Sequence, residues 1–308
     1  MIVSQKIPQQ LMMIRGLGLS LLLLVGWDFA IVLSYKVMHW SWVGSQSLPL
    51  ASYGVAIGIV VSLRNSSAYA RWWEARTLWG AIVNKSRTFA RQVVTTMSPK
   101  ANATAAEQAE AAAEQRQLVL YQVAYVHALS QQLRGRDPWA AVAHLLPDEN
   151  PAELAREKNL ALTLQCRMSA MLIAARDRGW LNQWEWQTID SSMAGLMDAQ
   201  GGAERIKNTP MPKQFDFFPM LFVEIYCLML PVGLVGVLGW FTPLGSTLVG
   251  FMFLALMKIG NDLEDPFENT IFDVPVTAIA TTVEINLRQL LGETELPSPE
   301  QPIRGVLW

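Results

Sequence analysis

Two apolar blocks constrain the fold of this chain more than any other feature: residues 17–63 and residues 219–259. A long stretch of ordinary soluble composition separates them. Charged residues make up only 16% of the chain, whereas about a quarter is usual for a soluble domain. The missing charge falls in the two blocks, and we therefore expect an integral membrane protein.

The first block predicts two membrane spans. Residues 17–35 are long enough to cross a hydrocarbon core at about 1.5 Å per residue. Asp28 lies in the middle of this span, where a lone carboxylate needs a partner or an aqueous face. The second span begins near Pro49 and reaches Leu63. No helix breaker separates it from residues 64–76, so we expect one long helix that leaves the membrane and continues into the cytoplasm.

The second block predicts a membrane hairpin of two further spans, residues 219–240 and residues 244–259, joined by a tight turn at Thr242 and Pro243. No alternating run indicates a sheet, and the expected fold class is all-α. The chain then divides into four parts. Residues 1–63 hold the N-terminal segment with spans one and two, residues 64–218 a large cytoplasmic helical region, residues 219–259 spans three and four, and residues 260–308 a polar, proline-bearing cytoplasmic segment.

Two details of the cytoplasmic region carry local predictions. Residues 101–117, rich in Ala, Gln and Glu, predict either a strong helix with a solvated face or a partly disordered insertion. Asn150 and Pro151 predict a helix start, with Asn150 as the cap and Pro151 at the first helical position.

Basic residues gather on one side of the four spans: Lys6 and Arg15 precede the first, Arg64, Arg71 and Arg76 follow the second, and Lys258 ends the fourth. The loop on the other side, residues 36–48, contains only Lys36. By the positive-inside rule both termini and the middle region are cytoplasmic. We expect a multi-pass protein of the cell inner (plasma) membrane.

Enzyme motifs are missing from the sequence: it has no phosphate-binding GxxxxGKT loop, no GxGxxG after a strand, no HExxH and no GxSxG. The histidines share no metal-ligand spacing, and we expect His127 and His144 on helix surfaces. The net charge of −2 gives no reason to expect nucleic acid as a partner. Cys227 falls inside an apolar run and predicts a buried free thiol.

One apolar stripe of the second span has two interpretations. Val55, Ile59 and Leu63 recur every four residues, so they lie on one helix face. Spacing alone favours a stripe that packs against other helices. The alternative is a stripe that lines a pore, with the small residues nearby, Ala51, Gly54, Ala56 and Gly58, allowing neighbouring helices to approach closely.

Three motifs occur in order around the four spans. The first follows span two and contains Arg64, Arg71, Trp72, Glu74, Arg76 and Trp79; the second, before span three, begins with Glu204 and Arg205; the third, after span four, is Leu263-Glu264-Asp265-Pro266-Phe267. Together they resemble the signature of the bacterial bestrophins, and the resemblance covers nearly the whole chain.

The resemblance implies a homopentameric ion channel in which five copies of the second span surround a single axial pore. The narrow neck of such a channel is three hydrophobic rings spaced one helical turn apart. Counting back from Arg71 places these rings on Val55, Ile59 and Leu63. Such rings cannot replace the hydration shell of an ion, so they gate by excluding water.

A second constriction of the family lies on a cytoplasmic helix before the second motif, and the same count reaches Glu185, beside Trp184. Bestrophins favour a small apolar residue there, so this position departs from the family pattern. Either the register of this count is off by one residue, or five carboxylates ring the exit. The second case would favour cations electrostatically. We expect monovalent ions, ranking the cations Na⁺ and K⁺ just ahead of chloride and other anions.

The calcium site of animal bestrophins is a run of consecutive acids, which this chain lacks. Glu268 and Asp273 are separated by uncharged residues, and too few oxygens are clustered for a calcium ion. We expect no cofactor, no metal and no calcium-dependent activation. The expected partners are further copies of the chain, membrane lipid and the permeant ions.

Two other classes of protein stay open. The spans could anchor a cytoplasmic helical scaffold or sensor that binds another protein. A proton-coupled transporter would use Asp28 and Glu224 as its intramembrane carboxylates. Oligomeric state separates these classes from a channel, because a pore with one stripe per chain needs several chains.

Overall fold

The computed structural model describes residues 1–3, 16–40, 43–44, 48–100, 102–147 and 149–308. Lys6 and Arg15, two of the basic residues used above for orientation, lie outside the described residues. The described part of the chain is helical and contains no strand, only isolated bridges near the termini. The chain forms two compact units. We call residues 4–72 with 210–265 the apolar unit, and residues 1–3, 73–209 and 266–308 the polar unit.

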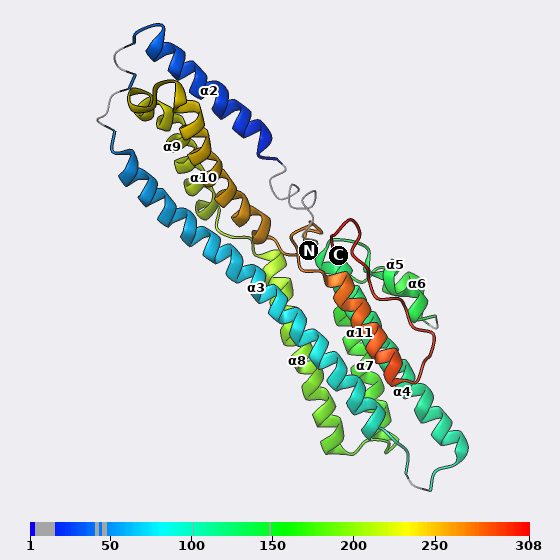
Figure 1. Cartoon of the computed structure of the whole chain (residues 1–308). Helices are drawn as coiled ribbons and strands as arrows, with labels where there is room; N and C mark the ends of the chain where they lie inside the picture. Colours follow the sequence, from blue (N-terminus) through cyan, green and yellow to red (C-terminus); the bar gives the residue numbers. More distant parts are fainter. Residues whose placement is uncertain (4–15, 41–42, 45–47, 101, 148) are drawn as a thin grey trace. The chain divides into compact units, whose positions relative to one another are not determined.

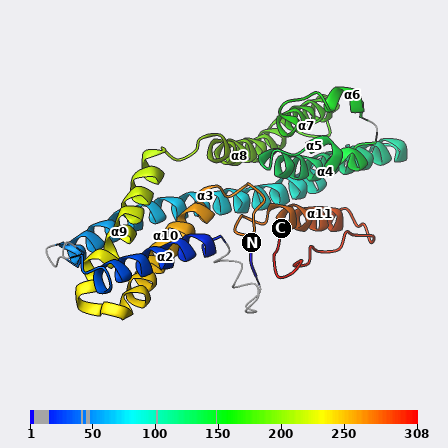
Figure 2. The ribbon, with the colours of Figure 1, turned by 90° about the horizontal axis from the view of Figure 1, so that it is seen from above.

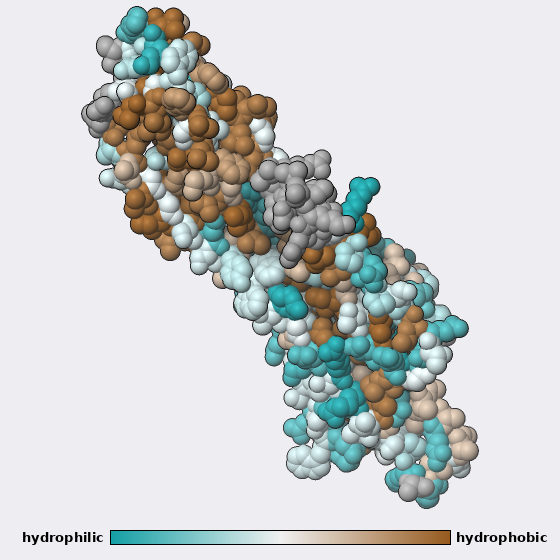
Figure 3. Space-filling model, viewed as in Figure 1, coloured by the Kyte–Doolittle hydropathy of each residue, from teal (hydrophilic) through white to brown (hydrophobic). Residues whose placement is uncertain are grey.

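The apolar unit consists of helix α2 (Gly18–Lys36), the first part of the long helix α3 (Leu50–Thr96), α9 (Gln214–Leu238), the short 3-10 turn η3 (Gly239–Phe241) and α10 (Thr242–Glu264). These helices lie side by side (Figures 1 and 2). Hydrophobic residues gather over them (Figure 3). Two segments, Gly18–Lys36 and the 51-residue stretch Gln214–Glu264, are long and apolar enough to cross a membrane. The predicted unbroken helix through residue 76 is confirmed by α3.

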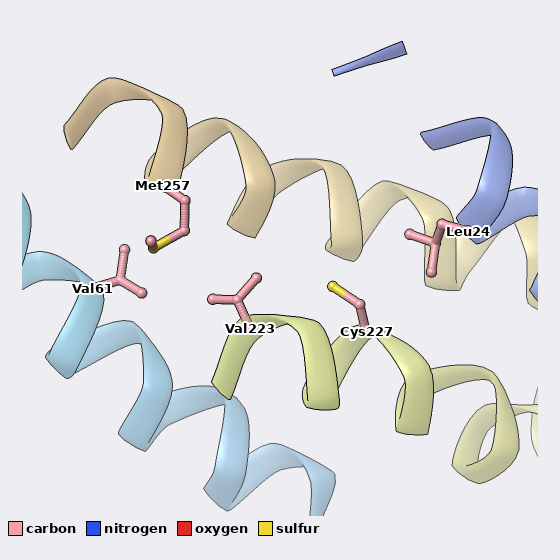
Figure 4. Packing of buried hydrophobic residues seen from close by; sticks show 5 residues of the cluster. All are labelled: Leu24, Val61, Val223, Cys227 and Met257. Carbon is pink, nitrogen blue, oxygen red and sulfur yellow. The ribbon is translucent and has the colours of Figure 1, made fainter. Parts of the chain in front are cut away.

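The core of the apolar unit brings one face of each helix together. Leu24 of α2, Val61 of α3, Val223 and Cys227 of α9 and Met257 of α10 are all buried and form one cluster (Figure 4). Cys227 is a buried free thiol, as its place in an apolar run predicted. Acyl chains are as apolar as these side chains, so the hydrophobic effect gives little preference for helix contacts over lipid contacts. Close packing within the cluster holds the helices together instead.

Asp28 has the partners that its position in an apolar helix requires. Its side chain is fully buried, and its two carboxylate oxygens accept hydrogen bonds of 2.9 Å from Ser246 Oγ and Thr247 Oγ1 of α10. A polar group buried without a hydrogen bond is costly, so these two hydroxyls account for a carboxylate at this position. They also join α2 to α10.

The hairpin between α9 and α10 turns earlier than the sequence predicted. Gly239 ends α9 at φ 54°, a left-handed conformation suited to glycine, and η3 makes the reversal. Thr242 and Pro243 are not the turn: they begin α10, with the proline in its first turn. Proline is favoured at that position because it has no amide hydrogen to leave unpaired.

The polar unit consists of the second part of α3 with α4 (Ala105–Leu133), α5 (Pro138–Val142), the 3-10 turn η2 (Ala143–Leu145), α6 (Pro151–Leu154), α7 (Leu160–Asp177), α8 (Gln183–Asn208) and α11 (Val276–Leu290). Residues 260–308 were expected as a polar segment without named elements. They contain instead the end of α10 and the amphipathic helix α11, which packs against α4.

Local capping explains two of the helix starts. Thr104 and Glu107 form a reciprocal capping box at the start of α4. The sequence predicted either a helix or a disordered insertion for residues 101–117, and the structure has a helix from Ala105 onward. Residue 101 lies outside the described residues. The predicted cap is confirmed by Asn150, whose side chain accepts from the backbone of Ala152 at 3.0 Å, although α6 is only four residues long.

The buried face of α3 in the polar unit carries both apolar and polar contacts. Trp79 is completely buried. Ser86 accepts a hydrogen bond of 2.9 Å from Gln122 of α4, and Gln92 accepts one of 2.8 Å from Ser192 of α8.

The prediction that His127 lies on a helix surface is wrong. Its ring is largely buried and lies 2.8 Å from the Glu284 carboxylate of α11. Burial raises the pKa of Glu284, but the hydrogen bond and charge of His127 together with Arg288 outweigh burial and hold this pKa below its usual range. The other histidine, His144, is exposed as expected.

A buried guanidinium fixes α3 within the apolar unit. The Arg64 side chain is only 1% exposed and donates to Asp216 of α9 and to two residues of α10, Asn261 at 2.6 Å and Glu264 at 3.1 Å. Asn65 adds a bond of 2.8 Å to the backbone oxygen of Leu256. Charge-assisted hydrogen bonds of this kind are among the stronger ones in proteins, and here one side chain connects three helices.

This network depends on Gly260. A Cβ atom at that position would lie 1.8 Å from Arg64 Nη1 and 2.3 Å from Asn65 Oδ1, far inside van der Waals contact. We expect Gly260→Ala to destabilise the folded protein by about 1–3 kcal/mol, the usual cost of inserting a carbon into a packed site. Thermal unfolding in detergent measures this as a lower Tm.

Gly26→Ala in α2 is the matched control, because nothing lies within 4 Å of the added Cβ. It should leave the Tm unchanged or slightly raised, since alanine favours a helix over glycine. Equal Tm values for Gly260→Ala and the wild type would mean that the close approach of α10 to Arg64 does not matter.

Candidate ion pathway

The predicted neck residues lie on an exposed face of α3. Val55, Ile59 and Leu63 are 66%, 58% and 63% exposed in the single chain. They are four residues apart, so each step along the helix is about 6 Å. Apolar side chains of this size are usually covered, and an exposed row of them marks a surface that contacts lipid or another copy of the chain.

The opposite face of the same helix is buried. Val61 is 1% exposed, Arg64 1% and Ala68 0%. Within one chain, therefore, the stripe is not the packing stripe that spacing alone favoured. The helix packs through its other face, and the stripe stays free for contacts outside the chain.

The stripe is uncharged along its length. Residues 50–63 contain no acidic or basic side chain, and Ser52, Ser62 and Ser66 are exposed near the apolar row. The small residues beside it do not all serve contacts outside the chain. Gly54 admits Tyr226 of α9, whose hydroxyl would lie 2.7 Å from an added Cβ, whereas nothing lies within 4 Å at Gly58.

The predicted aperture residues are at the start of α8 in the polar unit. Trp184 is 78% exposed. Glu185 completes a capping box with Asn182: its carboxylate accepts from the Asn182 backbone at 2.8 Å, and its own backbone donates to the Asn182 side chain at 2.9 Å. This local role accounts for a glutamate at this position, and it holds the carboxylate at the helix terminus.

Residues of the first and third motifs meet within the apolar unit. Arg64 contacts Glu264, as described above, and Arg71 Nε donates to the backbone oxygen of Glu264 at 2.7 Å. A guanidinium nitrogen of Arg71 also lies 3.6 Å from Asp265. Trp72 stacks against Tyr69, with ring centroids 6.5 Å apart. The acids of the third motif thus serve the end of α10 and its connection to α3.

Residues of the first and second motifs meet within the polar unit. Arg205 forms an ion pair with Glu74. Glu204 accepts hydrogen bonds from the side chains of Gln200 at 2.7 Å and Asn159 at 3.0 Å. The remaining motif residues do not join these networks. Arg76 borders a cavity of about 500 Å³. The other three are buried: Trp79, Pro266 and Phe267.

Several residues of these networks were missed from the sequence. Asp216 and Asn261 bind Arg64 from more than 150 positions away, and no spacing pattern links residues so far apart. Asp216 carried a usable signal, since an acid in the first turn of an apolar helix stabilises the helix dipole.

The structure contains no group of three or more His, Cys, Asp or Glu side chains that could hold a metal within its described residues. Asp273, one of the two acids considered above for calcium, is 2% exposed and accepts a hydrogen bond from Thr270. Burial raises the pKa of Asp273, although the hydrogen bonds from Thr270 oppose this shift. The Asp273 carboxylate therefore takes part in the internal hydrogen bonds of its own loop. The expected absence of calcium activation stays a prediction.

Comparison with known proteins identifies the fold and its family. The family model for the Bacterial/Fungal Bestrophin protein matches residues 4–289. A voltage-dependent anion channel-forming protein of Mesorhizobium japonicum is 34% identical over 80% of this chain and 75% of its own length. One of the same name from Escherichia coli K12 is 30% identical over 92% of this chain and 90% of its own length.

A solved structure agrees with these relatives. The crystal structure of a bacterial bestrophin homologue from Klebsiella pneumoniae aligns with a TM-score of 0.82 and 30% identity, covering 90% of this chain and 99% of that chain. The likeness extends over both units of the all-helical fold. The chain therefore belongs to the bestrophins, a family of membrane ion channels rather than enzymes.

Proposed function

We propose that the protein is a homopentameric channel for monovalent ions, with Val55, Ile59 and Leu63 of five α3 helices forming a hydrophobic neck around a single axis. The exposed apolar stripe of α3 carries this proposal: its three side chains are each more than half exposed in one chain. A row of side chains on one helix cannot enclose a pore, but several copies of it can.

The proposed topology has four spans. Helices α2, α9 and α10 each cross the membrane, and the first part of α3 is the fourth span, continuing into the cytoplasm as one helix. Both termini and the polar unit then lie on the cytoplasmic side of the inner membrane. Support comes from the basic residues near the span ends, among them Arg64, Arg71 and Lys258.

The neck would act as a barrier to ions through its lack of polar groups. Isoleucine, leucine and valine side chains cannot coordinate an ion, so water leaves a narrow ring of them and conduction requires the ring to be wetted. These side chains are smaller than aromatic ones. A modest separation of the α3 helices would therefore be enough to let water into the neck and remove the barrier.

For selectivity we propose cations such as Na⁺ and K⁺ through a ring of Glu185 carboxylates at the cytoplasmic exit. The neck itself carries no charge that could choose a sign, so charges elsewhere along the pathway must do so. Anion conduction is the second candidate, supported by the relatives named as voltage-dependent anion channel-forming proteins. Chloride would pass the same uncharged neck.

The scaffold and transporter alternatives have less support. The Asp28 carboxylate is not available to a transport pathway, because it is fully buried and accepts hydrogen bonds from Ser246 and Thr247. Glu224 is exposed on α9 and makes no hydrogen bond with Asp28. A scaffold has less support because the relatives of this chain are named as channel-forming proteins.

Replacing Ile59 and Leu63 by alanine tests the neck. Both changes shorten and widen the dewetted segment, so we expect a several-fold rise in single-channel conductance in planar bilayers. The same change at Leu23, an exposed residue of α2, is the matched control and should leave conductance as in the wild type.

Unchanged conductance in Ile59→Ala and Leu63→Ala, with the purified protein still pentameric by mass, would show that this face of α3 does not line the pathway. A monomer or dimer of the wild type in detergent would instead remove the channel architecture itself.

Glu185→Gln tests the aperture. Glutamine also completes a capping box, so the variant should fold normally while losing its charge. We expect the reversal potential in asymmetric KCl to shift toward that of a less cation-selective pore. Glu295→Gln, at an exposed position of the C-terminal segment, controls for the change of total charge. A wild type whose reversal potential is that of an anion channel, or a Glu185→Gln variant with no shift, would rule out the carboxylate ring.

A further inference from the structure

An apolar cavity lies between α3 and α9 within the apolar unit. Its volume is about 360 Å³, within the range of small-ligand sites. The wall comes only from these two helices and includes Tyr53 and Ile57 of α3 and Phe222 and Tyr226 of α9. Every residue of the wall is uncharged. Such a lining selects uncharged ligands, because nothing in the wall would compensate a buried charge.

The Tyr226 hydroxyl is a polar group without a partner at this site. The side chain is only 8% exposed. Its ring packs edge-to-face against Phe253 of α10, with ring centroids 5.3 Å apart. The hydroxyl reaches α3 at Gly54, where an added Cβ would lie 2.7 Å from it, yet it makes no hydrogen bond within the described part of the chain. A buried tyrosine hydroxyl usually has a partner, so this one is a fixed donor that a ligand can use.

The depth of Tyr226 limits where an acceptor can come from. Tyr226 is the middle residue of α9, which runs from Gln214 to Leu238, so each end of the helix is about 18 Å away. With α9 as a membrane span, as proposed above, Tyr226 lies near the centre of a hydrocarbon core about 30 Å thick. Phospholipid headgroups and ester carbonyls lie at the edges of that core. The acceptor must therefore belong to a molecule dissolved in the membrane interior.

The rest of the wall indicates the shape of the ligand. Tyr53 brings a second hydroxyl that makes no hydrogen bond among the described residues. The rings of Tyr53, Phe222 and Tyr226 favour a planar ring that can stack against them. Tyr53, Phe222 and Ile225 are also partly exposed, so the cavity opens to the surface of the apolar unit. A ligand with a long apolar tail can keep that tail outside the cavity.

The cavity does not coincide with the stripe of α3. None of Val55, Ile59 and Leu63 belongs to its wall. Tyr53 and Ile57 lie about 120–160° around the helix axis from Ile59. A molecule in the cavity would therefore bind beside α3 without filling the proposed neck.

We propose that this cavity binds an uncharged ring compound with carbonyl acceptors that is dissolved in the membrane, of the quinone class. A carbonyl oxygen accepts the hydrogen bond of Tyr226, the ring stacks among the aromatic side chains, and an apolar tail extends into the lipid. A hydrocarbon of the same shape fits the same space but leaves the Tyr226 hydroxyl without an acceptor. Recognition of the carbonyl is therefore the specific property of the site.

Native mass spectrometry of the full-length protein in detergent tests this proposal. The probes are a benzoquinone that carries one decyl and three methyl groups, and the equally substituted benzene that lacks the two carbonyl oxygens. We expect the wild type to bind the quinone several-fold more tightly than the hydrocarbon. Tyr226→Phe should lower quinone binding to the level of the hydrocarbon and leave hydrocarbon binding unchanged, since it removes only the hydroxyl.

Two matched controls separate the site from general effects. Tyr35→Phe removes the same atom from α2, outside the cavity wall, and should keep the preference for the quinone. Gly54→Ala should weaken quinone binding, because its Cβ would displace the Tyr226 hydroxyl. Gly58→Ala, one turn further along α3, should not, because nothing lies within 4 Å of its added Cβ.

Equal binding of the quinone and the hydrocarbon to the wild type would overturn the proposal, and this comparison needs no variant to fold. Binding of neither probe would also overturn it, and so would full retention of the quinone preference in Tyr226→Phe. The proposed channel does not depend on these results: a pentamer that conducts ions but binds neither probe would reject this site and leave the neck in place.

Discussion

The ion pairs and hydrogen bonds of Arg64 determine how α3 sits in the apolar unit. A guanidinium that is 1% exposed must have its charge compensated, and Asp216 and Glu264 supply the compensation from α9 and α10. Leaving a buried charge without a partner is strongly destabilising, because the desolvation of the charge is then not compensated. The same network constrains the backbone of α10, because only a glycine at position 260 lets α10 approach Arg64 closely enough.

This constraint fixes the rotation of α3 about its own axis and, through it, the direction of the stripe. Successive residues of a helix turn by about 100°, so Leu63, Ile59 and Val55 lie about 100–180° around the axis from Arg64. With Arg64 held against α9 and α10, these three side chains must face away from the rest of the chain. The buried polar network and the exposed apolar row are two consequences of one helix orientation. A symmetric assembly that covers such a row around an axis forms the hydrophobic neck proposed above.

Much of this architecture could be predicted from the sequence, because apolar length and missing breakers act locally. The helices α2 and α3 and the α9–α10 pair follow from that signal. The exact turn did not: a proline in the first turn of α10 has the same sequence appearance as a proline in a tight turn, and Gly239 was the actual reversal. The partners of Arg64 and Asp28 could not be predicted, since pairs such as Arg64–Asp216 and Asp28–Ser246 join distant positions. The burial of His127 depends on its contact with α11. The mixed composition of α11 gave no clear sign of this helix in the sequence. The roles of the neck and aperture residues stay predictions, because a single chain does not contain the axis that they would share.

The most direct test of the shared axis is chemical modification of Ile59→Cys during bilayer recording. The background should carry Cys166→Ser, because Cys166 is exposed whereas Cys227 is buried. If five α3 helices line the pathway, a charged thiol reagent added to the bath will change the current through Ile59→Cys. The same reagent will leave Val61→Cys, on the buried face of the helix, unaffected. A current through Ile59→Cys that does not respond, although mass analysis shows that the thiol has reacted, would contradict a pore lined by this face of α3.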